Sequence, residues 1–146
     1  MRVYLDTCTI QRPVDASQEA RVQREAAAVV ELLGLIRAGE LALVSSSALQ
    51  IEHSRNPQFG RWVFTEWVLS LAADVVPIDP AVEQRSQHYQ ALGMKELDAV
   101  HLACAVQAGV DFICTCDDRF LRRAKKADTG LTRVVSPLEL MQEVKR

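Results

Sequence analysis

The sequence lacks a long apolar run and shows no sign of a leader segment. The longest stretch without a charged residue runs from Ala99 to Val110, has twelve residues and still contains His101 and Gln107. A membrane-spanning helix needs about 20 mostly apolar residues, so a transmembrane protein is excluded. Met1 is followed at once by the strand-like run Arg2 to Leu5, so we expect the chain to begin here and to act in the cytoplasm.

Cysteine is also scarce. The four cysteines, at positions 8, 104, 114 and 116, are too few and too poorly spaced for a disulfide framework, and we read them as reduced thiols. Cys114 and Cys116 would point to one face of a strand, but a zinc site needs two more ligands at compatible spacing. The pattern therefore favours small buried side chains over a zinc site.

The length and the charge pattern indicate one domain with a basic segment. With 146 residues, 49% of them hydrophobic, and no repeat or flexible linker, residues 1–146 are expected to form a single domain. The net charge is −2, yet six Lys or Arg and one acid between Arg119 and Arg133 give that segment +5. It is either a surface for anions or an ordinary solvated helix face.

Strand-like and helix-like patterns alternate along the chain. Short apolar runs predict five buried strands, at Arg2 to Leu5, Leu41 to Val44, Val75 to Ile78, Phe112 to Thr115 and Arg133 to Val135. This alternation is typical of an α/β protein with a mainly parallel sheet. Such sheets bind ligands beyond the carboxyl ends of their strands.

Several helices can be predicted between these strands. One amphipathic stripe ends at Gly39 and consists of Val22, Ala26, Val29, Leu33 and Ile36. A capping residue followed by proline predicts helix starts at Asn56-Pro57, Asp79-Pro80 and Ser136-Pro137, the last with Glu139 closing a capping box. Leu97 to Ala108 is apolar almost all round and predicts the most buried helix.

Four acidic residues are candidates for a common site. Asp6 directly follows the first predicted strand, and Asp117 directly follows the run Phe112 to Cys116. Glu52 lies early on the helix after the second strand, and Asp98 opens the apolar helix. Singly, each has an ordinary explanation, because Asp98 complements a helix dipole and Asp is common in turns. Together they would repel one another unless they are protonated or neutralised by cations. Carboxylate oxygens suit Mg²⁺ or Mn²⁺, and such sites carry out phosphate chemistry.

The basic segment fits this chemistry. If Asp117 or Asp118 begins a helix, one of its faces carries Arg119, Arg122, Arg123 and Lys126, and the other face carries Phe120, Leu121 and Ala124. A phosphate backbone could run along the basic face into the metal site. The residues alone thus lead to the hypothesis of a nuclease.

The four motifs also resemble a known family. They are, in order, Leu5-Asp6-Thr7, Glu52, Asp98-Ala99-Val100-His101-Leu102-Ala103 and Thr115-Cys116-Asp117-Asp118-Arg119-Phe120. Their order and spacing resemble those of PIN-domain proteins, and more narrowly of VapC-type toxins from toxin–antitoxin pairs, over essentially the whole chain. The resemblance implies a Rossmann-like three-layer α/β/α sandwich and a Mg²⁺- or Mn²⁺-dependent endoribonuclease that leaves a 5′-phosphate and a 3′-hydroxyl. It also implies a homodimer and inhibition by a small antitoxin protein.

The resemblance further assigns roles to residues of this chain. It makes Asp6, Glu52, Asp98 and Asp117 the acids of the metal site, and Thr115 the residue that orients the last acid or a bound water. Many family members have Asn in place of Cys8, so a polar contact near Asp6 is expected to be missing. The tandem Asp117-Asp118 leaves open which acid faces the metal, and the spacing to Phe120 favours Asp117.

Other features have two interpretations each. His101 is either a hydrogen-bonded core residue or a contact to phosphate, and His53 and Arg55 lie either at the mouth of the site or elsewhere on the surface. An aromatic cluster, Phe59, Trp62, Phe64 and Trp67, is either core packing or a groove for an antitoxin helix or a second protomer. The serious alternative to the nuclease is a non-catalytic PIN-like module that binds RNA or protein.

Overall fold

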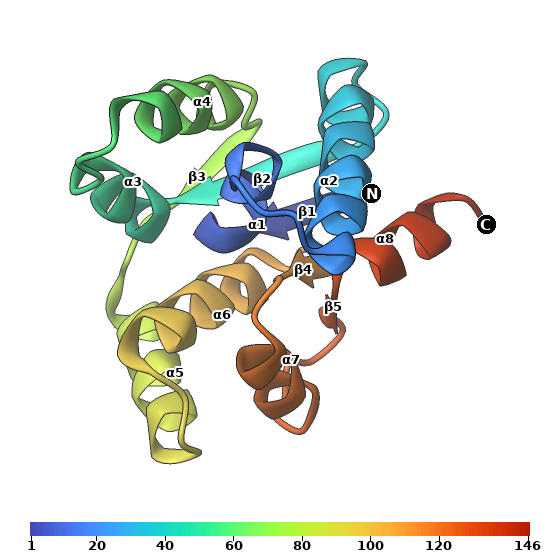
Figure 1. Ribbon diagram of the computed structural model, residues 1–146. Coiled ribbons are helices and arrows are strands. Elements are labelled where there is room, and N and C mark those ends of the chain that lie inside the picture. Colours follow the sequence, from blue (N-terminus) through green and yellow to red (C-terminus); the bar gives the residue numbers. More distant parts are fainter.

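A five-stranded parallel sheet forms the centre of the computed structural model, which describes residues 1–146 (Figure 1). Its strands are β1 (Arg2–Leu5), β2 (Ala42–Ser46), β3 (Asp74–Val76), β4 (Phe112–Cys114) and β5 (Arg133–Val135). They lie in the order β3-β2-β1-β4-β5, and every neighbouring pair is parallel. All five carboxyl ends therefore lie at one edge of the sheet.

Helices cover both faces of this sheet. They are α1 (Thr7–Gln11), the 3₁₀ helix η1 (Arg12–Val14), α2 (Ala20–Arg37), α3 (Ser47–Ser54), α4 (Phe59–Ser70), α5 (Pro80–Ala91), α6 (Glu96–Ala108), α7 (Asp118–Lys125) and α8 (Pro137–Val144). On one face α2 packs with α8, and on the other α6 packs against β2 and β4 with α3 and α5 beside it (Figure 1). The predicted three-layer α/β/α sandwich is confirmed.

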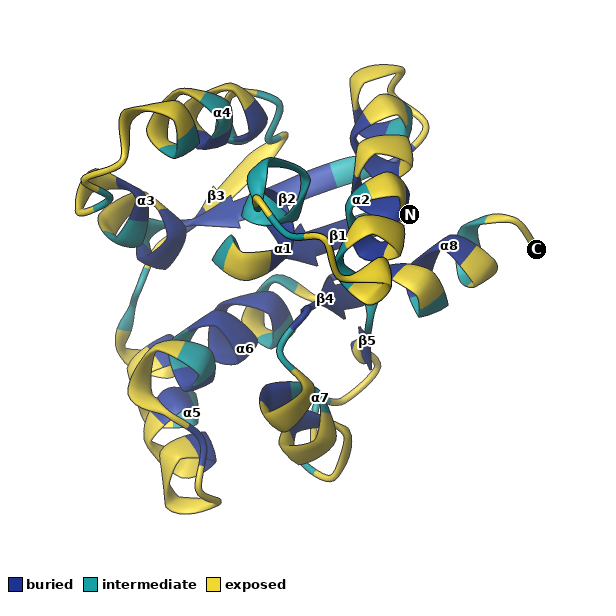
Figure 2. Cartoon of the chain, viewed as in Figure 1, coloured by how far each residue is buried: buried dark blue, intermediate teal, exposed yellow.

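The central strands are apolar because both of their faces are covered. Val3, Tyr4 and Leu5 of β1 are completely buried, and every residue of β4 is buried (Figure 2). Near-continuous apolar runs of this kind are typical of parallel strands between two helical layers. In α6 six residues are buried, which agrees with its prediction as a central helix.

The element boundaries differ from the predictions at a few positions. The second strand continues to Ser46, and the third begins at Asp74 and ends at Val76, before Pro77. Asp79 and Ser136 cap α5 and α8 as predicted, the latter in a complete capping box with Glu139.

The predicted helix start at Asn56-Pro57 is wrong. Asn56 instead accepts a hydrogen bond from the Gln58 amide at 3.0 Å and closes a tight turn. The side chain of Gln58 then caps α4, which begins at Phe59.

No helix has both the length and the apolar character that crossing a membrane requires. The four cysteines are free thiols.

Candidate active site

Asp6 is held rigidly where β1 ends. It is the N-cap of α1, and its Oδ1 accepts hydrogen bonds from the Thr9 amide at 3.1 Å, the Thr9 hydroxyl at 2.8 Å and the Cys8 thiol at 3.1 Å. All three contacts use the same oxygen, so Oδ2 remains free. The side chain is only 4% exposed. A carboxylate fixed through one oxygen offers the other in a defined position.

The Cys8 thiol corrects one expectation. The polar contact near Asp6 is not missing, because Cys8 Sγ makes it. Hydrogen bonding with Cys116, burial and the neighbouring charge of Asp6 raise the pKa of the Cys8 thiol, which keeps its proton available for donation. Cys8 Sγ also lies 3.6 Å from the hydroxyl of Thr115.

Asp117 occupies the equivalent place after β4. It caps α7, with Oδ1 accepting hydrogen bonds from the amides of Arg119 at 2.9 Å and Phe120 at 3.1 Å. Its own amide donates to the hydroxyl of the completely buried Thr115 at 3.1 Å. Thr115 therefore fixes the backbone of Asp117, and the Asp117 Oδ2 is left without a partner in the chain.

Asp98 has no partner of its own. It lies in the first turn of α6 and shares a hollow with Lys95, Asp117 and Arg119. Burial, followed by the charges of Asp117 and Asp6, raises the pKa of Asp98 to about 6, and His101 and Lys95 offset only part of this effect. The structure thus brings Asp6, Asp98 and Asp117 close enough to repel one another.

Glu52 is placed beside this group rather than within it. Its Oε1 accepts hydrogen bonds from His101 Nε2 at 2.9 Å and from the hydroxyl of Thr7, the residue next to Asp6. Burial acts to raise the pKa of Glu52, but the hydrogen bonds from His101 and Thr7 outweigh it and lower the pKa. Glu52 is therefore a fixed carboxylate with one free oxygen.

The structure decides between the two interpretations of several residues. His101 is 2% exposed and has hydrogen bonds on both ring nitrogens, so it is a core residue. His53 is also buried, stacks on Trp62 with ring centroids 4.9 Å apart and contacts Glu66. Arg55 is exposed and lines a hollow next to Glu52.

The basic face of α7 forms largely as predicted. Phe120 and Ala124 are buried against the sheet, while the arginines and lysines of the helix are exposed. One of the four predicted residues has another role: the guanidinium of Arg123 donates to the backbone oxygen of Gly93 in the turn before α6. Arg119, Arg122 and Lys126 remain without an acidic partner.

The aromatic cluster on α4 is not core packing. Phe59 is 78% exposed, Trp62 and Trp67 are 37% and 42% exposed, and Phe64 packs against the core. The interpretation as core residues is therefore wrong for three of the four. Their use as an interaction surface stays a prediction.

Sequence reasoning missed a polar hollow of about 560 Å³ next to Glu52. Polar and charged residues dominate its lining, which consists of Thr7, Gln11, Glu52, Arg55, Asn56, Pro57, Gln58 and Arg61. No motif could have revealed it, because its residues come from three separate elements.

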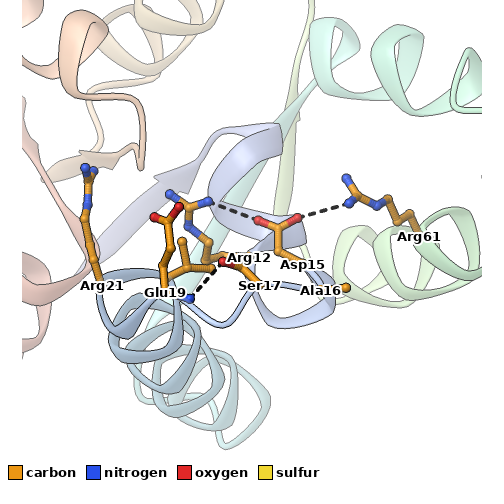
Figure 3. A pocket seen from close by; sticks show the side chains of 8 residues that line it. Arg12, Asp15, Ala16, Ser17, Glu19, Arg21 and Arg61 are labelled. Carbon is orange, nitrogen blue, oxygen red and sulfur yellow. Dashed lines mark hydrogen bonds and ion pairs between the residues drawn. The ribbon is translucent and has the colours of Figure 1, made fainter.

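A second hollow, of about 440 Å³, lies where η1 leads into α2 (Figure 3). Its arginines are paired: Asp15 binds Arg12 at 3.1 Å and Arg61 at 3.3 Å, and Glu25 binds Arg12 at 2.9 Å and Arg21 at 3.5 Å. Because these cations already have carboxylate partners, they stabilise the entry to α2 rather than offer free positive charge.

The donor set fits a hard divalent cation. No three His, Cys, Asp or Glu side chains are already arranged to hold a metal ion. Mg²⁺, however, usually takes one or two protein carboxylates and completes its shell with waters and substrate phosphates. Asp6, Asp98 and Asp117 all offer free carboxylate oxygens and no sulfur or nitrogen ligand, which suits Mg²⁺ or Mn²⁺ rather than zinc.

Comparison with known proteins agrees with this arrangement. The sequence matches the PIN domain family over residues 3–126. No curated protein matches the chain. In structure it is similar to FitAcB from Neisseria gonorrhoeae, with a TM-score of 0.62 and 17% identity over 93% of this chain and 98% of that one.

Two further solved structures have the same fold. VapBC2 from Rickettsia felis, solved bound to a DNA fragment from its promoter, has a TM-score of 0.60 and 11% identity over 92% of this chain and 98% of that one. PAE2754 from Pyrobaculum aerophilum has a TM-score of 0.61 and 15% identity over 99% of this chain and 90% of that one.

Proposed function

The chain belongs to the PIN-domain family, whose members are generally nucleases, and on this premise we propose that it is a metal-dependent endoribonuclease acting as the toxin of a type II toxin–antitoxin pair. One observation carries the proposal. Asp98 is a half-buried carboxylate without a hydrogen-bond partner, and it faces repulsion from Asp117 and Asp6. Such an arrangement costs stability unless a cation relieves it.

In this proposal Asp6, Asp98 and Asp117 hold Mg²⁺ or Mn²⁺ through their free oxygens, and Glu52 contributes directly or through water. The bound ion would activate the attacking water and offset charge on the scissile phosphate. Thr115 keeps Asp117 in position through its backbone amide.

The exposed cations of α7 would bring the RNA to these acids. Arg119 and Arg123 line the same hollow as Asp98 and Asp117, and since Arg123 is bound to the Gly93 carbonyl, Arg119 would contact the phosphate next to the scissile bond. Arg122 and Lys126 extend the positive charge outward along the helix. We propose that RNA follows this path and is cut in the cytoplasm.

We further propose that a small antitoxin protein is the partner and that the chain forms a homodimer. The resemblance to VapC-type toxins and the fold shared with FitAcB and VapBC2 support this partner. The exposed aromatic side chains of α4 offer the large apolar contacts that protein interfaces use.

The test is RNA cleavage by the purified protein with Mg²⁺, with Mn²⁺ and with chelator. We expect cleavage only with metal, and a loss of more than about 100-fold for Asp98→Asn and Asp6→Asn in folded protein. Cleavage that survives either substitution would refute the site. RNA binding of equal strength in chelator and in Mg²⁺, without cleavage, would instead identify a non-catalytic binding module.

A further inference from the structure

A chain of hydrogen bonds runs through the core behind Glu52. The hydroxyl of Tyr4 lies 2.7 Å from Ser46 Oγ and 2.7 Å from His101 Nδ1, and His101 Nε2 lies 2.9 Å from Glu52 Oε1. Tyr4 and Ser46 are completely buried and His101 nearly so. The chain joins β1, the consecutive elements β2 and α3, and α6, which come from three distant parts of the sequence.

The chemistry of these groups sets the direction of donation. An ionised carboxylate only accepts hydrogen bonds, so His101 donates to Glu52 from Nε2. Nδ1 of the neutral ring then accepts, which makes the Tyr4 hydroxyl its donor. Ser46 Oγ accepts from the Leu49 amide at 3.1 Å, and its own proton goes to the Tyr4 oxygen. Every proton of this arrangement has one acceptor.

The other states of the ring satisfy the same atoms less well. With the proton on Nδ1 instead, the Nε2 lone pair would face the Glu52 carboxylate. The Tyr4 hydroxyl would then face an N–H on Nδ1 and would lose its acceptor on the ring. The buried chain therefore selects one tautomer of His101, with the proton on the nitrogen that points to Glu52.

We infer that His101 and Tyr4 are positioning residues of the proposed nuclease, which hold one oxygen of Glu52 so that the other faces the site. This inference rests on the proposed function. The hydroxyl of Thr7 donates to the same oxygen of Glu52, Oε1, as His101 does. Oε2 is therefore the only oxygen of Glu52 left for metal, water or RNA. Glu52 also lines the polar hollow, where such a ligand would lie.

The decisive variant is Tyr4→Phe, which removes one buried hydroxyl and keeps the ring. Tyr89→Phe is its matched control, because Tyr89 is also a buried tyrosine and its hydroxyl donates at 2.7 Å to the Asp128 carbonyl, outside the site. We expect Tyr4→Phe to lower kcat for RNA cleavage about 10- to 100-fold with KM little changed, and Tyr89→Phe to leave kcat unchanged. Equal kcat for the two variants would overturn the inference.

A second measurement needs neither metal nor activity. Nitrogen-15 NMR of the histidine rings in the metal-free protein reports which ring nitrogen of His101 carries the proton. We expect a proton on Nε2 only, both in the wild type and in Tyr89→Phe, and a mixture of ring states in Tyr4→Phe. A proton on Nδ1 in the wild type, or no response to Tyr4→Phe, would contradict the inference.

Substitution of His101 itself separates positioning from packing. Gln can still donate to Glu52 from a similar place, whereas Leu cannot, so we expect His101→Gln to retain at least about tenfold more activity than His101→Leu. Equal activity of the two would speak against positioning. If the wild type cleaves no RNA with Mg²⁺, the proposed function fails, while the NMR result still decides whether His101 is held as a donor to Glu52.

Discussion

Arg21 binds both carboxylate oxygens of Asp118, at 2.6 and 2.7 Å, and so ties the start of α7 to α2. This ion pair shows that the adjacent acids Asp117 and Asp118 have different surroundings. Asp118 is turned toward α2, while its neighbour Asp117 shares a hollow with Asp98. The geometry thus places Asp117, and not Asp118, next to Asp98, and Asp117 as the acid that faces the metal stays a prediction.

The tandem provides a matched pair of substitutions. We expect Asp117→Asn to reduce metal-dependent cleavage by more than about 100-fold, because it removes one of the proposed ligands. Asp118→Asn should keep most of the activity and cost only about 0–1 kcal/mol, since its ion pair with Arg21 is half-exposed. Cleavage assays and urea unfolding of both variants test this. The reverse order of activities would assign the metal to Asp118.

Asp98 should make the stability of the metal-free protein depend on pH. Its pKa is raised to about 6 in the folded chain, chiefly by burial and then by Asp117 and Asp6. The folded state therefore holds this proton more tightly than the unfolded state does, and the stability falls as pH rises from about 4 to about 6. Above that range Asp98 is ionised and the loss of folding stability is complete, and saturating Mg²⁺ should reduce this loss.

Asp98→Asn removes this penalty. At pH 7 without metal we expect the variant to be more stable than the wild type by about 1 kcal/mol after solvent screening, or about 2–4 °C in Tm. Thermal melts between pH 4 and pH 7.5 test this, and the difference should shrink toward pH 4. A variant that is less stable than the wild type at pH 7 would show that the carboxylate is not under strain.

Much of the fold follows from patterns within short segments. The strands of the sheet are visible as Val-, Ile- and Phe-rich runs because both faces of a parallel sheet are covered. Asp6 and Asp117 could be placed at one edge because each follows such a run directly, and parallel strands end on the same side. The predicted start of α4 was wrong because both Asn56 and Gln58 can accept a hydrogen bond from a following amide. Asn56 uses this to close a turn and Gln58 uses it to cap the helix, a choice that depends on the path of the chain.

The contacts that complete the site are of another kind. The Tyr4 and His101 side chains, 97 residues apart, meet because α6 packs against β2 and β4, the two strands that flank β1, and no local pattern indicates this. The same holds for Arg21 and Asp118. Sequence spacing therefore identifies which acids gather at the edge, but not which partners hold them.

The basic face of α7 should govern affinity for RNA rather than the chemical step. Arg122 and Lys126 are exposed and have no acidic partner, so Arg122→Gln and Lys126→Gln should each raise KM and leave kcat nearly unchanged. Each should also reduce the salt dependence of RNA binding by about 0.7 in the slope of log K against log salt. Lys145→Gln, at the C-terminal end and paired with Glu31, is the control. An unchanged slope would remove α7 from the RNA path.

Substitution of Phe59 tests the proposed protein interface most directly. Trp62 stacks on the buried His53, so its truncation would disturb the fold of α4 as well as any interface. Phe59 is 78% exposed and can be changed to Ser at little cost in stability. If α4 receives the antitoxin, Phe59→Ser should weaken inhibition of cleavage about tenfold or more, as expected for an aromatic anchor. Titration of antitoxin against cleavage measures this, with light scattering to follow the dimer. Unchanged inhibition and an intact dimer would speak against α4 as the interface, because Phe59 is the most exposed large apolar side chain of this helix.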